Sequence, residues 1–283
     1  MCCICLRGVS STSACQGRRA YFAAGAAPSK LSIMTGFSFE IVDASDYDEL
    51  RPEYSPDAVA WVAERCGLGP GSRVVDLAAG TGRLSGRFLQ IGVDVIAVEP
   101  AANMRAVLER RFPAVHPIVA TAESMPMDDG AVDAVVVGNA FHHFDRVAAM
   151  AEIHRVLRPG GALAVFWAWP AEEEQLRIPG MRPIHDALEE TWAESAIMAA
   201  HRTWAEPPAP VDGFDGSERR EFPATHVIPA ARLADLYATF SDVISMPVPT
   251  RAWLLDRIKQ LSRGLPEELH LPGRTVVDLW VRR

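Results

Sequence analysis

The sequence predicts an α/β fold: a Rossmann-like, mostly parallel seven-stranded sheet with an antiparallel final strand and a helical cap insertion after strand five. The strongest observation is a short β-branched run, Val74-Val75, which leads into a turn of small residues at 78–82. The apolar residues that follow, such as Leu84 and Phe88, recur at helical spacing. A strand, a glycine turn and a helix in this order form the ligand-binding corner of a doubly wound sheet. The second observation is that apolar runs and helical patterns keep alternating as far as residue 167.

The elements around this corner follow from capping residues and periodicity. Ser55-Pro56 favours a helix start, because serine suits the N-cap and proline the first helical position. Asp145 is expected to cap a later helix in the same way. Besides the strand at 74–75, the sequence predicts strands at 93–98, 115–120, 131–138 and 162–167, and helices at 37–51, 55–66, 83–91, 100–111 and 145–157.

Beyond residue 170 the pattern changes, and this divides the chain into parts. Two tryptophans of the next segment, Trp192 and Trp204, either line an apolar acceptor pocket or fill a small core of the cap. Helices are expected at 181–201, 230–240 and 250–261, and the last strands at 219–227 and 275–281. We therefore expect a ligand-binding core at 34–170, a helix-and-loop cap at 171–218, and a C-terminal part at 219–283 that completes the sheet and adds substrate-side helices.

The first 33 residues differ in composition from the rest. They hold four of the five cysteines and four basic residues but no acid, and the first acid of the chain is Glu40. Such a tail is either a transit peptide or sequence upstream of a start at Met34. We expect a disordered or non-native extension there. The cysteine spacing matches no paired metal-binding motif, so no metal site is predicted.

The composition of the whole chain limits the classes of function. At 283 residues with a net charge of −8 and a pI near 5.5, it lacks the basic face of a general nucleic-acid binder. No apolar run reaches the length of a membrane-spanning helix. Cys66, alone in the body of the chain, is typical of a reduced, cytoplasmic location. A small-molecule partner suits these properties best.

The acids around the glycine turn indicate the ligand. A dinucleotide site has a third glycine where this chain has Ser85, and Asp76 ahead of the turn would repel a phosphate. That acid suits a cationic group such as an ammonium. Glu99 follows the next strand, about 20 residues on, where an acid accepts hydrogen bonds from ribose hydroxyls. Ribose, adenine and a positively charged amino-acid tail together describe S-adenosylmethionine (SAM).

Several motifs of the chain resemble those of one family. Asp76-Leu-Ala-Ala-Gly-Thr-Gly82 followed by Glu99, then Ala122-Glu123-Ser-Met-Pro126, and later the stretches at 133–144 and 155–161, are similar to the motifs of class I SAM-dependent methyltransferases of type 11. The resemblance runs from about Tyr47 to Trp167. Ala78 departs from it, since the family usually has glycine there.

The resemblance also implies which residues bind the cofactor. Tyr47-Asp-Glu-Leu-Arg51 matches a box that closes over SAM in the family, and Arg51 could meet the methionine carboxylate through its planar guanidinium. The alternative is an ordinary Arg-Pro helix stop with surface ion pairs. The expected cofactor-binding residues are Tyr47, Arg51, Asp76, Ala78, Gly80, Gly82, Glu99, Pro100, Met104, Ala122, Glu123, Asn139 and Ala140.

His142 and His143 are the candidates for catalysis. They follow a strand whose carboxyl end should face the transferred methyl group. Adjacent side chains rarely point the same way, so at most one of them is expected to be a base; otherwise each is a structural histidine bonded to the backbone. A base is needed only where the acceptor must lose a proton.

These inferences lead to one favoured function and two alternatives. The favoured function is a SAM-dependent methyltransferase acting on oxygen, nitrogen or carbon of a small molecule by in-line displacement. The first alternative is a SAM-binding protein that does not methylate and uses the cofactor as a structural element, for example in a natural-product cyclisation. The second is an NAD-dependent oxidoreductase, against which Asp76 argues.

Overall fold

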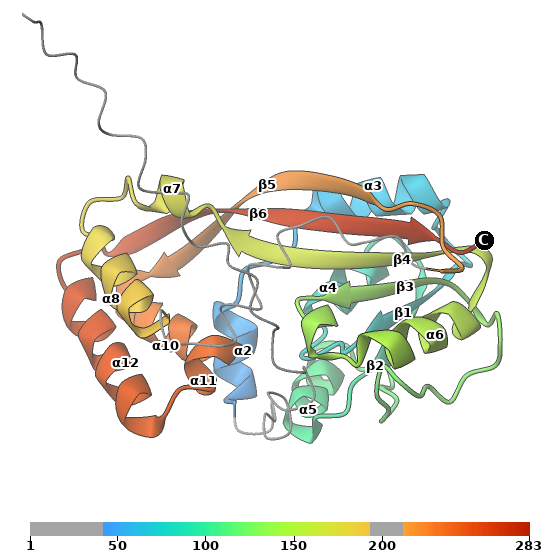
Figure 1. Cartoon of the computed structure of the whole chain (residues 1–283), viewed down its shortest axis with the longest axis horizontal. Helices are drawn as coiled ribbons and strands as arrows, with labels where there is room; N and C mark the ends of the chain where they lie inside the picture. The colour runs from blue at the N-terminus through green and yellow to red at the C-terminus, as the bar shows by residue number, and fades with distance from the viewer. Residues whose placement is uncertain (1–41, 193–211) are drawn as a thin grey trace, which may run out of the picture. The chain divides into compact units, whose positions relative to one another are not determined.

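In the computed structural model, the described residues are 42–192 and 212–283, and they belong to one compact unit, Gly36–Arg283. The N-terminal extension expected at 1–33 and the part of the cap that carries Trp204 lie outside the described residues. The chain has the expected α/β fold, and its elements alternate around one mixed sheet (Figure 1).

The sheet has six strands among the described residues, in the order β2-β1-β3-β4-β6-β5. Parallel pairs join β2 to β1, β1 to β3 and β3 to β4, whereas β6 runs antiparallel to both β4 and β5. The expected antiparallel end of the sheet is therefore present. The strands are β1 (Arg73–Leu77), β2 (Asp94–Val98), β3 (Val132–Gly138), β4 (Leu157–Pro170), β5 (Glu218–Pro229) and β6 (Glu268–Val281).

The strand expected at 115–120 is reduced to a single bridge, so the predicted count of seven strands is not reached in the described part of the chain. Ile118 bridges Val98 in parallel: its N–H donates to the Ala97 carbonyl at 2.8 Å, and its carbonyl accepts from Glu99 N–H at 3.0 Å. The described neighbours of Ile118 make no further backbone hydrogen bond to β2, so the contact stays a single bridge. The apolar run was a correct signal for proximity to β2 but not for a strand.

Ten helices and two short 3-10 turns connect the strands of the described residues. The caps follow the sequence expectations in part: Asp145 accepts the N–H groups of Val147 and Ala148, whereas the Ser55 side chain makes no cap bond and its N–H donates to Thr275 Oγ1. The helices are α2 (Ala44–Leu50), α3 (Pro56–Cys66), α4 (Arg83–Leu89), α5 (Ala102–Arg111), α6 (Arg146–Val156), α7 (Glu172–Gln175), α8 (Arg182–Trp192), α10 (Leu233–Ala238), α11 (Ser241–Ile244) and α12 (Val248–Ser262), with η2 at Phe141–His143 and η3 at Ala230–Arg232.

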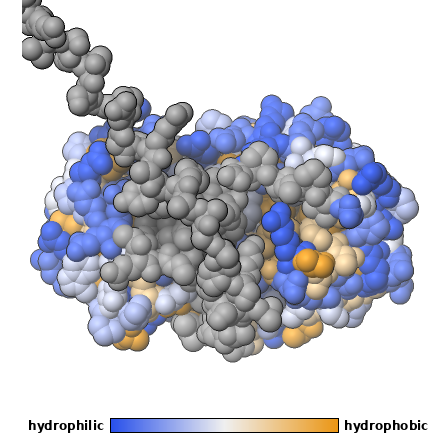
Figure 2. Space-filling model, viewed as in Figure 1, coloured by the Kyte–Doolittle hydropathy of each residue, from blue (hydrophilic) through white to orange (hydrophobic). Residues whose placement is uncertain are grey.

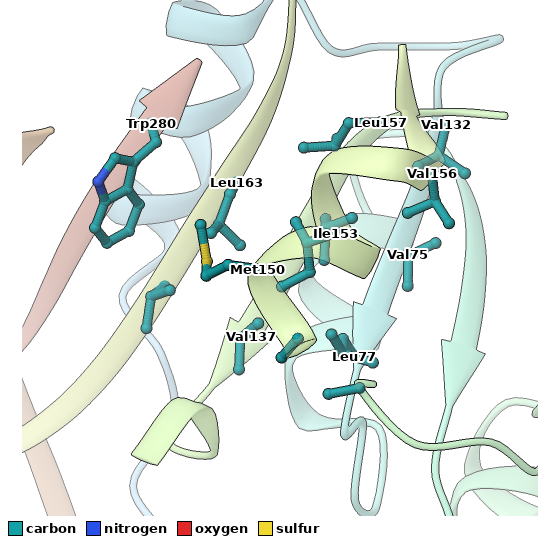
Figure 3. Close-up of a cluster of buried hydrophobic side chains, with 14 of the residues drawn as sticks. Val75, Leu77, Val132, Val137, Met150, Ile153, Val156, Leu157, Leu163 and Trp280 are labelled. Carbon is teal, nitrogen blue, oxygen red and sulfur yellow. The ribbon is translucent and has the colours of Figure 1, made fainter. Parts of the chain in front are cut away.

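Helices cover both faces of the parallel part of the sheet. On one face α6 packs Met150, Ile153 and Val156 against strand residues such as Leu163 (Figure 3). On the other face α3 and α4 contribute a second cluster around Phe88. Burial on both faces explains why β3 is mostly apolar and why β1 is buried at every position after Arg73.

A third apolar cluster lies at the far ends of β5 and β6, where α8, α10 and α12 gather (Figure 1). Ile184 and Leu188 of α8 pack there with Leu254 and Ile258 of α12, and all four are buried. The described part of the segment 171–218 therefore contains two helices, α7 and α8, and α8 packs with helices from the C-terminal part of the chain.

The visible surface of the described residues is mostly hydrophilic, with small apolar patches, one of them over α6 (Figure 2). None of the described helices has both the length and the apolar character needed to cross a bilayer.

Candidate functional site

A cavity of about 240 Å³ opens at the carboxyl ends of β1, β2 and β3. We call it the strand-end cavity. This is the position where open α/β sheets bind ligands. His143 contributes to its wall. Ten of the expected cofactor-binding residues line it: Tyr47, Ala78, Gly80, Glu99, Pro100, Met104, Ala122, Glu123, Asn139 and Ala140.

The glycine turn forms one wall of this cavity through left-handed backbone conformations. Ala78, Gly80 and Gly82 have φ values of 56°, 57° and 81°. Gly82 does not line the cavity; a Cβ there would lie 3.0 Å from Leu108 Cγ, so this glycine allows α5 to pack closely. Alanine at position 78 carries conformational strain that glycine would not. Such strain is typical of functional sites.

Glu99 stands at the end of β2 with both carboxylate oxygens anchored by the backbone. Oε2 accepts from Gly80 N–H at 2.9 Å and Oε1 accepts from Ala101 N–H at 2.7 Å. The residue is 6% exposed, and burial raises the pKa of its carboxyl group. Its position is thus fixed before any ligand arrives, and each oxygen keeps a second lone pair for a hydroxyl donor.

Asp76 lies beneath the turn and does not line the cavity. It is 1% exposed, and its Oδ2 accepts a 2.6 Å hydrogen bond from Ser85 Oγ. Burial raises the pKa of the Asp76 carboxyl to about 7, and the Ser85 bonds oppose that rise. Ser85, which occupies the place of the third glycine in a dinucleotide motif, therefore ties the end of β1 to the first turn of α4.

Asn139 turns the chain sharply at the end of β3. Its φ is 51°, and its side-chain Oδ1 accepts from Ala168 N–H at 2.9 Å. Within the described residues, Asn139 and Ala78 are the two non-glycine positions with positive φ. Both lie at the strand-end cavity. Asparagine tolerates this conformation better than most residues.

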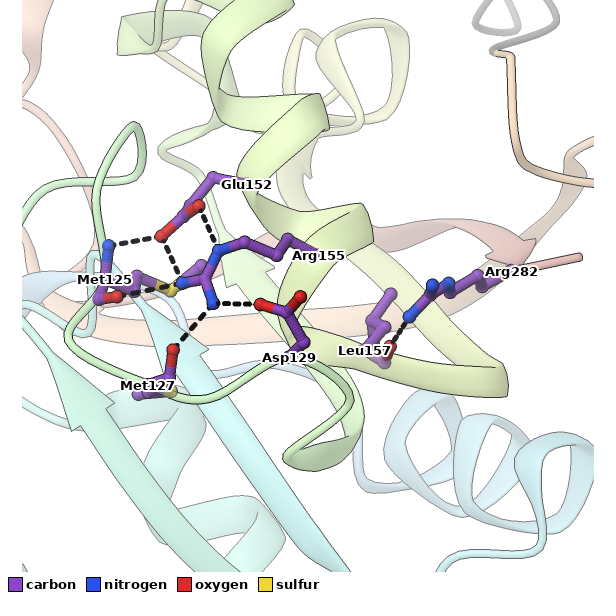
Figure 4. A network of polar contacts seen from close by, with 7 residues as sticks. All are labelled: Met125, Met127, Asp129, Glu152, Arg155, Leu157 and Arg282. Atoms are coloured by element: carbon purple, nitrogen blue, oxygen red, sulfur yellow. Dashed lines mark hydrogen bonds and ion pairs between the residues drawn. The ribbon is translucent and has the colours of Figure 1, made fainter.

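The loop that carries Ala122 and Glu123 is held in place by Arg155 of α6 (Figure 4). The Arg155 guanidinium donates to the carbonyls of Met125 and Met127 and pairs with Glu152 and Asp129 at 2.8 Å. Glu123 Oε1 accepts from the N–H of Asp145 at 3.0 Å. The cavity wall on this side is therefore fixed to the start and the end of α6.

The two candidate histidines lie in η2 and face different surroundings. His143 lines the strand-end cavity. The ring of His142 stacks on Trp167, with centroids 5.8 Å apart and planes at 22°. The structure therefore brings one of the two to the cavity.

With this geometry described, comparisons with known proteins identify the family. A family profile described as "Methyltransferase domain" matches residues 75–165. An uncharacterized methyltransferase from Mycobacterium tuberculosis is 34% identical over 227 residues, covering 78% of this chain and 84% of that protein. This chain belongs to the type 11 family of class I SAM-dependent methyltransferases.

Two further comparisons concern one sequence relative and one solved structure. A demethylmenaquinone methyltransferase from Renibacterium salmoninarum is 34% identical over 134 residues, covering 43% of this methyltransferase and 56% of that protein. A solved structure from Anaeromyxobacter dehalogenans, described as a type II methyltransferase, has a TM-score of 0.57 to this chain at 22% identity. The match covers 83% of this chain and 98% of the other. The second comparison shows that the two share a fold.

Arg51 of this methyltransferase lies away from the strand-end cavity. Its guanidinium sits over the rings of Phe240 and Tyr47, 4.3 and 5.1 Å from their centroids, and Nη2 donates to the Thr239 carbonyl at 3.1 Å. It lines a second cavity of about 80 Å³ between the long ends of β4, β5 and β6 and the helices α8 and α10. We call this the lateral cavity.

Arg83 holds the segment that carries Tyr47 and Arg51 against the glycine turn. It donates to the backbone carbonyls of Asp48 and Arg51 and pairs with Glu53 at 2.8 Å, and its side chain is 9% exposed. The sequence analysis missed this role. An arginine directly after the glycine turn was visible, but nothing near it in sequence indicated its partners.

The lateral cavity was not predicted from the sequence. Its walls include His185 of α8, His226 of β5, Tyr237 of α10 and Trp169 of β4. Two contacts connect the walls of the two cavities: Arg51 with Tyr47, and Ala168 with Asn139. Of the lateral residues named here, Arg51 belongs to a motif of the sequence, whereas Trp169, His185, His226 and Tyr237 do not.

Proposed function

We propose that this methyltransferase binds SAM in the strand-end cavity and transfers its methyl group to a small molecule. The observation that carries the proposal is Glu99, whose two oxygens accept from Gly80 N–H in the left-handed glycine turn and from Ala101 N–H just beyond β2. A fixed carboxylate beside a close-approach turn suits ribose hydroxyls next to an amino-acid tail.

The remaining wall suits the other parts of the same ligand. Met104 and Pro100 would pack against the adenine, with Ala122 and Glu123 at its edge, while Tyr47 would close the opposite side. Asn139 and Ala140 would border the sulfonium. When bound, SAM supplies an already activated methyl group, so the chain mainly has to position the acceptor and exclude water.

The acceptor class is proposed from a relative of this chain. The Renibacterium relative is named for a quinone precursor, and by analogy we propose a small organic acceptor for this chain. His143 is the predicted base that lines the cavity, and His142 would support it through the ring contact at 3.8 Å. Family membership favours transfer over a SAM-binding protein that does not methylate; mass spectrometry with a labelled methyl group separates the two.

The test of the donor site is Glu99→Ala, with SAM affinity measured by calorimetry. Loss of a charged hydrogen-bond acceptor should weaken binding by about 1–3 kcal/mol. Glu109→Ala is the matched control, because Glu109 lies exposed on α5. Circular dichroism verifies that both variants are folded. Unchanged affinity in a folded Glu99→Ala variant would remove the cofactor assignment.

A further inference from the structure

A buried aspartate interrupts the apolar layer between the sheet and α6. Asp278 lies on β6 between Val276 and Trp280, and both of these apolar residues belong to the cluster that α6 covers. Alternate residues of a strand share a face, so Asp278 points into the layer that contains Trp280 (Figure 3). It is 2% exposed. A carboxylate in such a place costs free energy unless its oxygens are paired, so its partners indicate its role.

Both oxygens of Asp278 accept hydrogen bonds from the neighbouring strands. Arg219, directly opposite on β5, donates from Nε to Oδ1 at 2.6 Å and from Nη2 to Oδ2 at 2.8 Å. Oδ2 also accepts from Nε1 of Trp167 on β4 at 3.2 Å. A buried ion pair adds little net stability, because desolvation offsets the attraction of the charges. Stability alone therefore does not explain the pair, whereas the third bond gives it a role: it presents a fixed acceptor to the indole.

The indole of Trp167 begins a row of rings that reaches the strand-end cavity. Its plane lies at 22° to that of the His142 ring, with centroids 5.8 Å apart. The centroid of the His142 ring lies 3.8 Å from that of His143. We call the rings of Trp167, His142 and His143 the ring row. Because His143 lines the strand-end cavity, successive side-chain contacts connect Asp278 in the sheet with the cavity wall.

The backbone that carries the two histidines is held by its own hydrogen bonds. Asn139 N–H donates to the Phe166 carbonyl at 2.9 Å, which ties the end of β3 to β4. His143 N–H donates to the Ala140 carbonyl at 2.8 Å within η2. A fixed backbone does not select the ring orientation, since the outer torsion of a histidine side chain is broad. The flat face of the indole against His142 restricts that orientation.

We propose that Asp278 is a positioning residue, which holds the His143 ring at the strand-end cavity through the ring row. The inference rests on the proposed function, in which His143 is the base. Arg219 fixes the carboxylate, the carboxylate fixes the indole, and the indole limits the orientations of the imidazole rings. A base must lie within hydrogen-bond reach of the proton that it removes, so the orientation of its ring decides whether it acts. The antiparallel strands β5 and β6 thereby contribute to a site formed at the ends of the parallel strands.

The test replaces the ion pair by apolar residues and observes the histidines of the full chain by NMR. Arg219→Leu/Asp278→Leu leaves neither charge of the pair buried, so the variant should fold, and circular dichroism verifies this. With 13C-labelled histidine, His143→Gln identifies the His143 signal. That signal should be one sharp line in the wild type. In the double variant it should broaden or split, because the ring then samples several orientations. SAM affinity by calorimetry should stay within about twofold, since Glu99 and the glycine turn are untouched.

Three further variants separate positioning from folding. Glu221→Leu/Arg274→Leu is the matched control, because it removes an exposed 3.0 Å ion pair between the same two strands, and it should leave the His143 signal unchanged. Asp278→Asn keeps an oxygen that accepts the indole N–H, so it should retain the sharp line. Trp167→Leu removes the flat ring and should reproduce the broadening.

A folded Arg219→Leu/Asp278→Leu variant with an unchanged His143 signal would overturn the proposal. Equal broadening in the control pair, or in Asp278→Asn, would do the same, because the bond to the indole would then not be the cause. A wild-type chain that binds no SAM would refute the proposed function instead. The His143 signals are therefore recorded with and without SAM, so that the free chain tests the positioning role by itself.

Discussion

The two cavities differ in how far the fold has already satisfied their polar groups. In the strand-end cavity both Glu99 oxygens and the Asn139 side-chain oxygen are hydrogen-bonded to backbone N–H groups. In the lateral cavity, Arg51, His185 and His226 each bring a buried nitrogen without a partner among the described residues. The first site is complete before its ligand arrives, and the second is not.

This difference has consequences for binding and for stability. A ligand with a constant structure is best met by a rigid, preorganised site, as at the strand-end cavity. Buried nitrogen atoms without hydrogen-bond partners cost stability, so the lateral cavity loses stability that the strand-end cavity retains.

The largest expected effect concerns Asp76, whose buried carboxyl lies beneath the glycine turn. Its folded-state pKa of about 7 lies above the unfolded value near 3.9, so the folded chain binds the proton more tightly. The stabilising contribution is full below about pH 4 and is lost as the pH rises through about 7. It amounts to about 4 kcal/mol. Urea unfolding of wild type and Asp76→Asn from pH 4 to 8 should show a difference that changes by this order.

The same titration tests whether the SAM ammonium contacts the Asp76 carboxylate, as the sequence predicted. If the SAM ammonium meets this carboxylate, saturating SAM should flatten the pH dependence of the wild type, because a bound cation lowers the carboxyl pKa. An unchanged slope would show that Asp76 acts only through Ser85. A wild-type slope equal to that of Asp76→Asn without SAM would contradict the burial argument itself.

Much of the first cavity could be predicted from sequence, and almost none of the second. Residues 78–82, Glu99 and Asn139 each follow a strand, and the carboxyl ends of parallel strands must meet at one edge of the sheet. Arg51, Trp169, His185 and His226 lie in four separate segments. They meet because β4, β5 and β6 extend beyond the parallel core toward a group of helices. No local pattern records how far a strand extends or which helices pack at its end.

The misjudged strand at 115–120 has the same cause on a smaller scale. Its apolar residues indicated burial beside β2 correctly, since Ile118 bridges Val98. A ladder needs repeated backbone hydrogen bonds, and in the described residues this segment makes them to β2 only at Ile118. The pattern of apolar residues in a sequence therefore predicts burial more reliably than it predicts backbone hydrogen bonding.

Arg83 holds the chain segment that both cavities share, so its loss should affect both. Arg83→Met removes donors from two backbone carbonyls and from Glu53, and should cost about 3 kcal/mol of unfolding free energy. The control is Arg87→Met, one turn further along α4, whose 3.4 Å pair with Glu53 is worth less than about 1 kcal/mol. Equal urea midpoints for the two variants would show that the segment is held by packing alone.

The smallest expected effect is a gain in stability on replacing His185. It tests most directly whether the polar groups of the two cavities differ in how well the fold satisfies them. His185 is 8% exposed, and its Nε2 has no partner among the described residues, so His185→Leu removes the desolvation cost of that nitrogen and keeps the apolar contacts. The unfolding free energy should rise by about 1 kcal/mol. His270→Leu, at an exposed position, should change it by less than about 0.5 kcal/mol. A lower urea midpoint for His185→Leu would mean that the fold itself satisfies this histidine, and the two cavities would then not differ in kind.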